Sequence, residues 1–133
     1  MNHLVAVYGS LKRGHFNHDL IKDAKFVGDD WLFDFTLYTL GPFPAIKRHK
    51  SNGVLVEIYK VTTLQLNLLD QLEGFDSKSP EKSFYLRVTI ESSYGSAWVY
   101  EYNREVEKDT RIESGNWCSA DNNPRGLNYE SDA

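Results

Sequence analysis

A short apolar run that ends at a glycine loop constrains the fold of this chain more than any other stretch. Residues 4–7 read L-V-A-V, which is typical of a buried strand, and Gly9 interrupts that strand two residues later. The whole stretch from Val5 to Asn17 reads V-A-V-Y-G-S-L-K-R-G-H-F-N. Because Gly9 has no Cβ, the backbone there can turn sharply and approach a ligand closely. We therefore expect a pocket floor whose N–H groups hold a small anionic or carbonyl-bearing group.

Length and composition predict one domain with a strand-rich core. The chain has 133 residues, of which 41% are hydrophobic and 14% aromatic, so it is too apolar to be disordered. Aromatic residues favour strands over a helical bundle. From Glu105 onward the sequence becomes polar. We predict a domain over residues 1–118 and a loosely attached polar tail over residues 119–133.

Charge and cysteine content argue against several classes of protein. The net charge is −4, from 15 basic and 19 acidic side chains, whereas nucleic-acid binders usually carry a basic excess. Cys118 is the only cysteine, so no internal disulfide can form, which suits a reducing compartment. No apolar run approaches the roughly 20 residues that a membrane helix needs. We expect a cytoplasmic protein that binds neither nucleic acid nor membrane and exists as a monomer or weak homodimer.

Hydrophobic periodicity predicts an α+β domain with the order β-α-β-β-β-α-β-β. A short helix over residues 18–24 follows Asn17 as its N-cap. Residues 26–41 fit one or two strands, and the Asn52-Gly53 pair is a strong hairpin signal before a strand over residues 54–61. Residues 84–91 and 97–103 predict two more strands. The sheet is expected to be mostly antiparallel, and curling it closed would make a small barrel.

The second helix is the one that the sequence predicts most clearly. It begins at Thr62 or Thr63, runs through Leu72 and ends at Gly74. Its leucines recur at three- and four-residue spacing, which predicts a core-facing stripe formed by Leu64, Leu68, Leu69 and Leu72.

Glu73, at the end of that helix, is the candidate proton-transfer group. A helix C-terminus disfavours negative charge, and apolar Leu72 and Phe75 flank the carboxyl, so both effects raise its pKa. The alternative is that Glu73 is a solvent-exposed residue at the helix end, because most glutamates are exposed. Asp70 lies three residues earlier on roughly the same helix face, as a second carboxylate or as a surface residue.

Other catalytic and metal motifs are missing. The loop lacks a Walker A lysine-serine/threonine pair, and no G-x-S-x-G surrounds Ser10, so we do not expect Ser10 to be a nucleophile. His15 and His18 have no cysteine or acidic partner at ligand-like spacing, so we expect solvated histidines and no metal site.

Four segments together resemble the gamma-glutamylcyclotransferase-like family, especially its branch of gamma-glutamylamine cyclotransferases and their small bacterial relatives. In chain order they are similar to the family's Y-G-[ST]-L loop, its D-x-x-E-G helix end, its Y-x-R strand and a G-[DN]-W signature of some members. The segments are V-A-V-Y-G-S-L-K-R-G-x-x-N at 5–17, L-D-Q-L-E-G-F at 69–75, F-Y-L-R-V-T-I at 84–90 and S-G-N-W at 114–117.

This resemblance implies a fold, an activity and a set of site residues. The fold is a small, mixed, mostly antiparallel β-barrel flanked by two or more helices. The activity is intramolecular cleavage of a small γ-glutamyl compound to 5-oxoproline and a free amine, without metal or cofactor. Glu73 is implied as the catalytic acid and base. The substrate-binding residues implied are Tyr8, Gly9, Ser10 and Leu11.

The sequence also departs from the family's pattern. Ser10 stands where threonine is commoner, which keeps the hydroxyl. Phe43-Pro44 stands where the aromatic residue is often tyrosine, so one pocket hydroxyl is missing, and the short loop 75–83 leaves substrate choice open. The alternative function is a non-catalytic protein that holds or sequesters a small anionic ligand in the same pocket.

Overall fold

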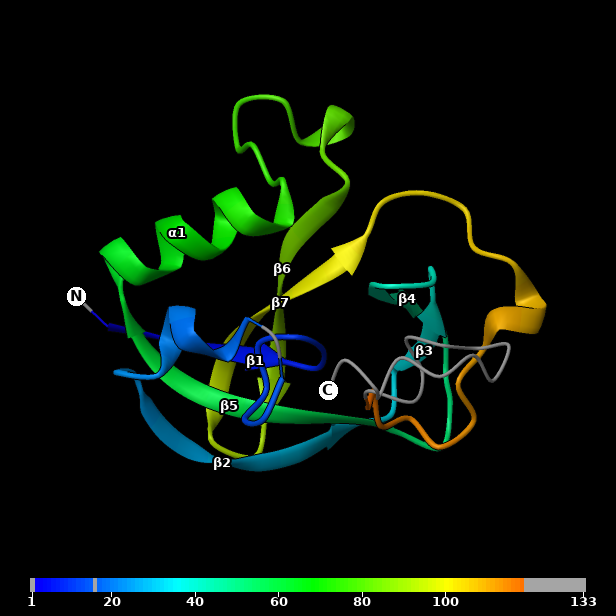
Figure 1. Cartoon of the computed structure of the whole chain (residues 1–133), viewed down its shortest axis with the longest axis horizontal. Helices are drawn as coiled ribbons and strands as arrows, with labels where there is room; N and C mark the ends of the chain where they lie inside the picture. The colour runs from blue at the N-terminus through cyan, green and yellow to red at the C-terminus, as the bar shows by residue number, and fades with distance from the viewer. Residues whose placement is uncertain (1, 16, 119–133) are drawn as a thin grey trace, which may run out of the picture.

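A five-stranded sheet forms most of the fold in the computed structural model, which describes residues 2–15 and 17–118. All neighbouring strands in it are antiparallel except β1 and β7, which are parallel. The predicted α+β class with a mostly antiparallel sheet is therefore confirmed (Figure 1). In spatial order the strands are β2 (Lys25–Leu32), β5 (Val54–Thr62), β1 (Asn2–Val7), β7 (Gly95–Tyr102) and β6 (Tyr85–Ser92).

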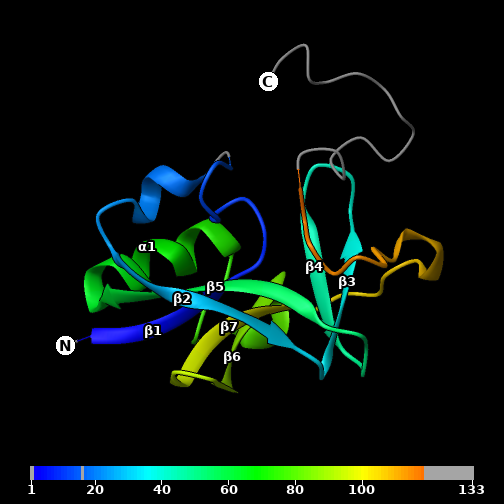
Figure 2. The same cartoon turned by 90° about the horizontal axis from the view of Figure 1, so that it is seen from below.

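A separate two-stranded sheet stands beside the larger one. It consists of β3 (Phe35–Thr39) and β4 (Pro44–Arg48), which Figure 2 shows as a hairpin next to the ends of the longer strands. Lys47 joins the two sheets, because its Nζ donates to the carbonyl oxygen of Tyr102 at 2.9 Å. Closure of the strands into a barrel is not confirmed, since the described strands form these two distinct sheets.

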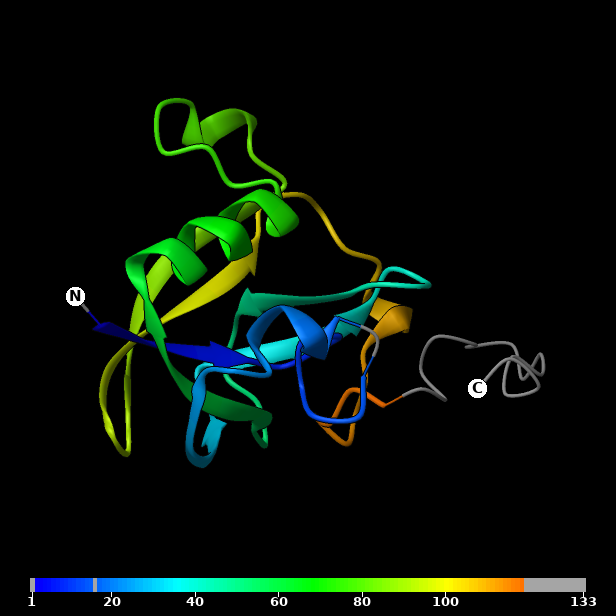
Figure 3. The same ribbon diagram turned by 60° about the vertical axis from the view of Figure 1, so that its left-hand side comes forward.

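One α-helix, α1 (Thr63–Glu73), lies across a face of the five-stranded sheet (Figures 1 and 3). Thr62 begins it with a capping box: its side chain accepts from the Gln65 N–H, and the Gln65 side chain accepts from the Thr62 N–H. Gly74 ends it in the left-handed conformation, with φ of 71°. The helix lies where it was predicted, but it is one residue longer at its end, since Glu73 rather than Leu72 is its last residue.

The predicted core face of α1 is only partly right. Leu69 is buried as predicted, but its buried companion is Leu66. Leu64, Leu68 and Leu72 are 70%, 42% and 40% exposed, respectively. The helix packs on the sheet along a narrow face. Leu64, Leu68 and Leu72 lie beside that face and therefore remain exposed to solvent.

Three local predictions fail for identifiable reasons. The segment predicted as a helix over residues 18–24 forms only the 3₁₀ turn η1 (His18–Ile21). The strand β4 was not predicted, because its basic residues and its initial Pro44 suggested a loop, although proline is accepted as the first residue of a strand. The Asn52-Gly53 pair does not connect a hairpin, since β4 and β5 belong to different sheets.

The core has two parts, one on each face of the large sheet. One contains Trp117 and side chains of the β3–β4 hairpin, and the other lies under α1 and η1. Two further 3₁₀ turns, η2 (Pro80–Lys82) and η3 (Lys108–Thr110), lie in the connections. No helix in the described part of the chain is long and apolar enough to cross a membrane. The predicted tail, residues 119–133, lies outside the described residues.

Candidate active site

A cavity of about 380 Å³ opens between the end of β1, the end of α1 and the β3–β4 hairpin. This volume lies within the range of about 300–1,000 Å³ that is usual for small-molecule sites. The lining is mainly apolar and aromatic, and it comes from residues 6–11, the β3–β4 turn, the end of α1 and the tyrosines of β6 and β7.

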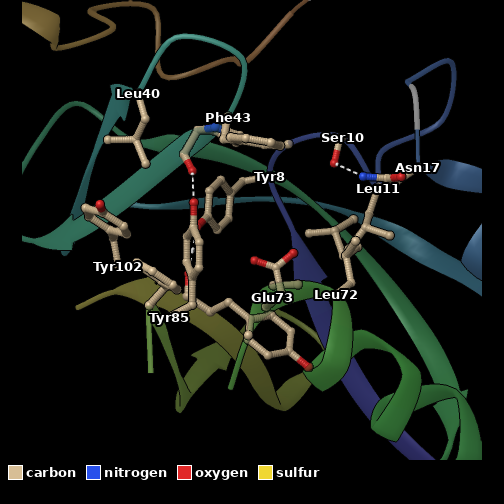
Figure 4. A pocket seen from close by; sticks show the side chains of 17 residues that line it. Tyr8, Ser10, Leu11, Asn17, Leu40, Phe43, Leu72, Glu73, Tyr85 and Tyr102 are labelled. Atoms are coloured by element: carbon tan, nitrogen blue, oxygen red, sulfur yellow. Dashed lines mark hydrogen bonds between the residues drawn. The ribbon is translucent and has the colours of Figure 1, made fainter. Parts of the chain in front are cut away.

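The structure places all the residues predicted for the site around this one cavity. The loop after β1 forms one side, and the side chain of Glu73 points inward from the end of α1 (Figure 4). The loop and Glu73 are more than 60 residues apart in the sequence, so their separation alone does not indicate that they lie at the same cavity. The five predicted residues that line the cavity are Tyr8, Gly9, Ser10, Leu11 and Glu73.

The loop after β1 is fixed from behind by hydrogen bonds of Lys12 and Arg13. Lys12 is buried, and its Nζ donates to Asn116 Oδ1 at 2.7 Å and to the Trp117 carbonyl oxygen at 2.8 Å. The N–H of Arg13 donates to Glu57 Oε1 at 2.9 Å. The loop is therefore held by both the S-G-N-W segment and the neighbouring strand β5.

Asn17 has a different role from the one predicted. It precedes η1, but its side chain makes no capping hydrogen bond there. Instead, Nδ2 donates to Ser10 Oγ at 2.9 Å, and the Asn17 N–H donates to the Ser10 carbonyl oxygen at 2.7 Å. Both residues line the cavity, so Asn17 sets the orientation of the Ser10 hydroxyl.

Burial in the cavity raises the pKa of Glu73 to about 7. The neighbouring Leu72 and the tyrosine rings offer the carboxylate little of the solvation that water would give, which disfavours its charged form. Figure 4 shows the carboxyl directed towards Tyr8 and Tyr85 in the cavity. A carboxyl with a pKa near neutrality is suited to both accepting and donating a proton.

Four tyrosines line the walls, namely Tyr8, Tyr85, Tyr100 and Tyr102, and of these the sequence analysis selected Tyr8 alone. The hydroxyl of Tyr8 donates to the Tyr100 carbonyl oxygen at 2.6 Å, and that of Tyr85 donates to the Pro44 carbonyl oxygen at 2.7 Å. Burial raises the pKa of Tyr8, Tyr85 and Tyr100, so all three stay neutral. Tyr100 and Tyr102 alternate along β7, and that spacing was the available signal that they share a face.

The comparison with known families agrees with this geometry. The family model described as gamma-glutamyl cyclotransferase, AIG2-like, matches residues 5–119, a range that includes all the residues lining the cavity. The chain belongs to this family. The family membership inferred from the four sequence segments is thus confirmed.

Relatives of this chain align with it along most of their own length. A Vibrio cholerae protein, named provisionally as a gamma-glutamylcyclotransferase, is 36% identical over 120 residues, covering 89% of this chain and 97% of the relative. The Escherichia coli gamma-glutamylcyclotransferase family protein YtfP is 35% identical over 118 residues, covering 88% and 97%. The crystal structure of an AIG2-like protein from Mus musculus aligns with a TM-score of 0.73 at 26% identity, covering 95% and 93%.

Asp70 joins α1 to the large sheet. Its Oδ1 accepts from the Tyr100 hydroxyl at 2.6 Å, and its Oδ2 accepts from Arg87 Nη1 at 2.7 Å. Arg87 and Tyr100 are directly opposite each other on β6 and β7, so one carboxylate reaches both. Asp70 does not line the cavity, and its contacts hold the end of α1, where Glu73 lies.

The histidines of the chain do not cluster with other possible metal ligands in the described residues. Within residues 2–15 and 17–118, no group of three or more histidine, cysteine or acidic side chains is placed to hold a metal ion. His18 contacts the Leu11 carbonyl oxygen through Nδ1 at 2.9 Å, which helps to hold the loop.

Proposed function

We propose that this protein is a gamma-glutamyl cyclotransferase that converts a γ-glutamyl amine or related γ-glutamyl compound into 5-oxoproline and a free amine. One observation carries the proposal: the Glu73 carboxyl, with a pKa of about 7, points into the cavity that the loop of Gly9 forms on its other side. Family membership supports the same class of reaction.

The substrate supplies its own nucleophile in this reaction. Its α-amine nitrogen attacks the γ-amide carbonyl carbon, a new C–N bond closes a five-membered ring, and the original amide C–N bond breaks. The proton lost by the attacking nitrogen is balanced by the proton gained by the leaving amine. A protein that holds the γ-glutamyl chain folded therefore supplies effective molarity, and Ser10 need not act as a nucleophile.

Glu73 is assigned the proton transfers. The ionised carboxylate accepts the proton that the α-amine gives up, and the resulting acid donates a proton to the leaving nitrogen. A single group can serve both steps when its pKa lies near the working pH, because neither protonation state is then scarce.

The loop is assigned the substrate's oxygen atoms. In the described part of the chain, the N–H groups of Ser10 and Leu11 donate to no protein acceptor, and both residues line the cavity. Backbone donors fixed in this way are suited to stabilise the oxyanion that develops on the γ-carbonyl, an effect often worth about 3–4 kcal/mol per donor. Tyr8, Gly9, Ser10 and Leu11 are thus proposed as the substrate-binding residues.

The test is release of 5-oxoproline from a panel of γ-glutamyl amides by wild type and Glu73→Gln. We expect the variant to lose about 10²- to 10⁴-fold in kcat, the usual contribution of a positioned acid and base. Glu81→Gln, at an exposed position on η2, is the matched control and should keep full activity. Unchanged turnover by Glu73→Gln would contradict the proposed mechanism.

A binding assay separates this function from the alternative. A protein that only sequesters a ligand would bind a γ-glutamyl amide saturably, release no product and keep equal affinity in Glu73→Gln. Calorimetry on both proteins with the same amide measures this directly, and that combination of results would favour the binding protein.

A further inference from the structure

We propose that Glu57, a buried carboxylate on β5, is a positioning residue: it fixes the loop after β1 so that the N–H groups of Ser10 and Leu11 face the substrate. Glu57 is not among the residues that line the cavity, so it acts through the loop and not by contact with the substrate. This inference rests on the proposed function, because those two N–H groups are the donors assigned to the γ-carbonyl oxygen.

Ser10 and Leu11 are the central residues of a tight turn. The Lys12 N–H donates to the Gly9 carbonyl oxygen at 3.0 Å, which closes the turn across them. A turn of this kind pairs only the groups of its outer residues, so the N–H groups of the two central residues stay unpaired. The direction in which those groups point therefore depends on what holds the residues that leave the turn.

Glu57 lies beside the point where β1 ends and the loop begins. It is the strand partner of Val7, the last residue of β1. Its Oε1 accepts from the N–H of Arg13, the residue after the turn, at 2.9 Å, and its Oε2 accepts from Arg13 Nε at 3.4 Å. The first of these contacts holds the main chain itself. The strand β5 thus fixes the exit of the turn against the large sheet.

Tyr59 links Glu57 to the carbonyl group of Leu11. The Tyr59 hydroxyl donates to Glu57 Oε1 at 2.8 Å, and burial raises the pKa of Tyr59, so the hydroxyl keeps its proton. The Tyr59 ring packs against the His18 ring, with the centroids 5.8 Å apart. His18 Nδ1 in turn donates to the Leu11 carbonyl oxygen at 2.9 Å, since a carbonyl oxygen can only accept. One cluster therefore holds both the exit of the turn and the peptide group that follows Leu11.

A carboxylate is a costly choice at this position. The Glu57 side chain is 12% exposed, and a buried charge destabilises a protein unless it is paired and hydrogen-bonded. The Arg13 N–H, Arg13 Nε and the Tyr59 hydroxyl supply that compensation. Without Glu57, the Arg13 N–H and the Tyr59 hydroxyl lose their acceptor, and the loop must shift to restore one. Such a shift moves Ser10 and Leu11, which lie just before Arg13 in the chain.

The test compares Glu57→Ala with Glu57→Gln in the release of 5-oxoproline from one γ-glutamyl amide. Alanine removes the acceptor, so we expect kcat to fall at least about tenfold, as the displacement of oxyanion donors predicts. The pH midpoint of kcat/KM should stay at the wild-type value, because Glu73 is untouched. Glutamine keeps an oxygen that can accept from both the Arg13 N–H and the Tyr59 hydroxyl, so it should retain most of the wild-type kcat. An unchanged kcat in Glu57→Ala, or an equal fall in Glu57→Gln, would overturn the assignment.

Val61→Ala controls for a general loss of stability. Val61 is fully buried on the same strand, but it pairs with His3, near the end of β1 that lies away from the loop. The variant leaves a cavity in the core and lowers stability without touching the loop. Its kcat, measured per folded molecule, should match that of wild type. A fall equal to that of Glu57→Ala would mean that lost stability, rather than the position of the loop, reduces the rate, and would overturn the inference.

Nuclear magnetic resonance gives a readout that does not depend on turnover. Isotope-labelled wild type and Glu57→Ala are titrated with 5-oxoproline, and the amide signals of Ser10 and Leu11 are followed. We expect these signals to shift in wild type and to need a higher 5-oxoproline concentration in the variant. Equal responses, or no response in wild type, would overturn the positioning role. If wild-type protein cleaves no γ-glutamyl amide, the proposed function fails, and this comparison still decides whether Glu57 positions the loop.

Discussion

A Cβ atom on Gly9 would lie 2.4 Å from Cγ of Pro44, although Gly9 lies in the loop after β1 of the large sheet and Pro44 begins β4 of the small one. Real Cβ contacts are essentially never that short, so Gly9→Ala must displace the loop or the hairpin. We expect the variant to lose about 1–3 kcal/mol of unfolding free energy, as overpacked sites usually do. Urea denaturation followed by circular dichroism measures this loss.

Removal of the proline ring should restore much of that loss. In the double variant Gly9→Ala/Pro44→Ala, the Cγ and Cδ atoms that meet the new methyl group are gone. We expect the Gly9 substitution to cost about 1 kcal/mol less in this background than in wild type, which a double-mutant cycle reports as a coupling energy. Additive effects would show that the ring of Pro44 is not the reason for glycine at position 9.

The rate of the proposed reaction should depend on pH through Glu73. Because the carboxylate form starts the reaction and its pKa is about 7, kcat/KM should rise with pH through a midpoint near 7. A pH–rate profile for one γ-glutamyl amide checks this expectation. A midpoint near 4.5, the ordinary value for glutamate, would mean that the Glu73 carboxyl does not control the rate.

Stability should depend on the same group with the opposite sign. The folded protein holds the Glu73 proton more tightly than the unfolded chain, so unfolding free energy falls as pH rises from about 4.5 to about 7 and stays lower above that. Glu73→Gln removes this loss. We expect the variant to match wild type near pH 4 and to exceed it by about 2 kcal/mol at pH 8, less than the full pKa shift allows because Glu73 is only half-buried.

Glu81→Gln serves again as the control for this measurement. It removes an exposed carboxylate, so its difference from wild type should be small and the same at pH 4 and pH 8. A Glu73→Gln protein whose stability relative to wild type is the same at both pH values would show that Glu73 is solvated.

The contacts of Asp70 should matter more than those of an exposed ion pair. Asp70→Asn weakens the bond to Arg87, which is itself largely buried, so we expect a loss of about 2 kcal/mol. Glu113→Gln removes the exposed Arg111–Glu113 pair and should change unfolding free energy by less than about 0.5 kcal/mol. Similar losses in both variants, measured by urea denaturation, would count against a positioning role for Asp70.

The sequence predicted those parts of the fold that local chemistry decides. The helix that ends at Glu73 follows from the capping residue Thr62 and the stop at Gly74, and the β6–β7 hairpin follows from two strands around Gly95. The burial pattern of α1 was harder to predict, because Leu66 and Leu68 have the same side chain and only the packing of the sheet distinguishes them.

Long-range pairing accounts for most of what was not predicted. The Asn52-Gly53 signal depends on local backbone preference, and Gly53 does adopt a φ of 117°, but the strands on either side pair elsewhere. In the site, the sequence identified the loop and Glu73. Leu40 was not identified, because it reaches the cavity only through the position of the β3–β4 hairpin, whose second strand the sequence analysis did not predict.

The division of the strands into two sheets has a consequence for how such a protein could change over evolutionary time. Under the proposed chemistry, Glu73 and the loop around Ser10 are carried by the large sheet and its helix, whereas Leu40 and Phe43 are carried by the tip of the hairpin. Substitutions at that tip would reshape one wall of the cavity without moving the proton-transfer group. A library confined to residues 40–43 would therefore vary that wall while Glu73 and the Ser10 loop stay in place.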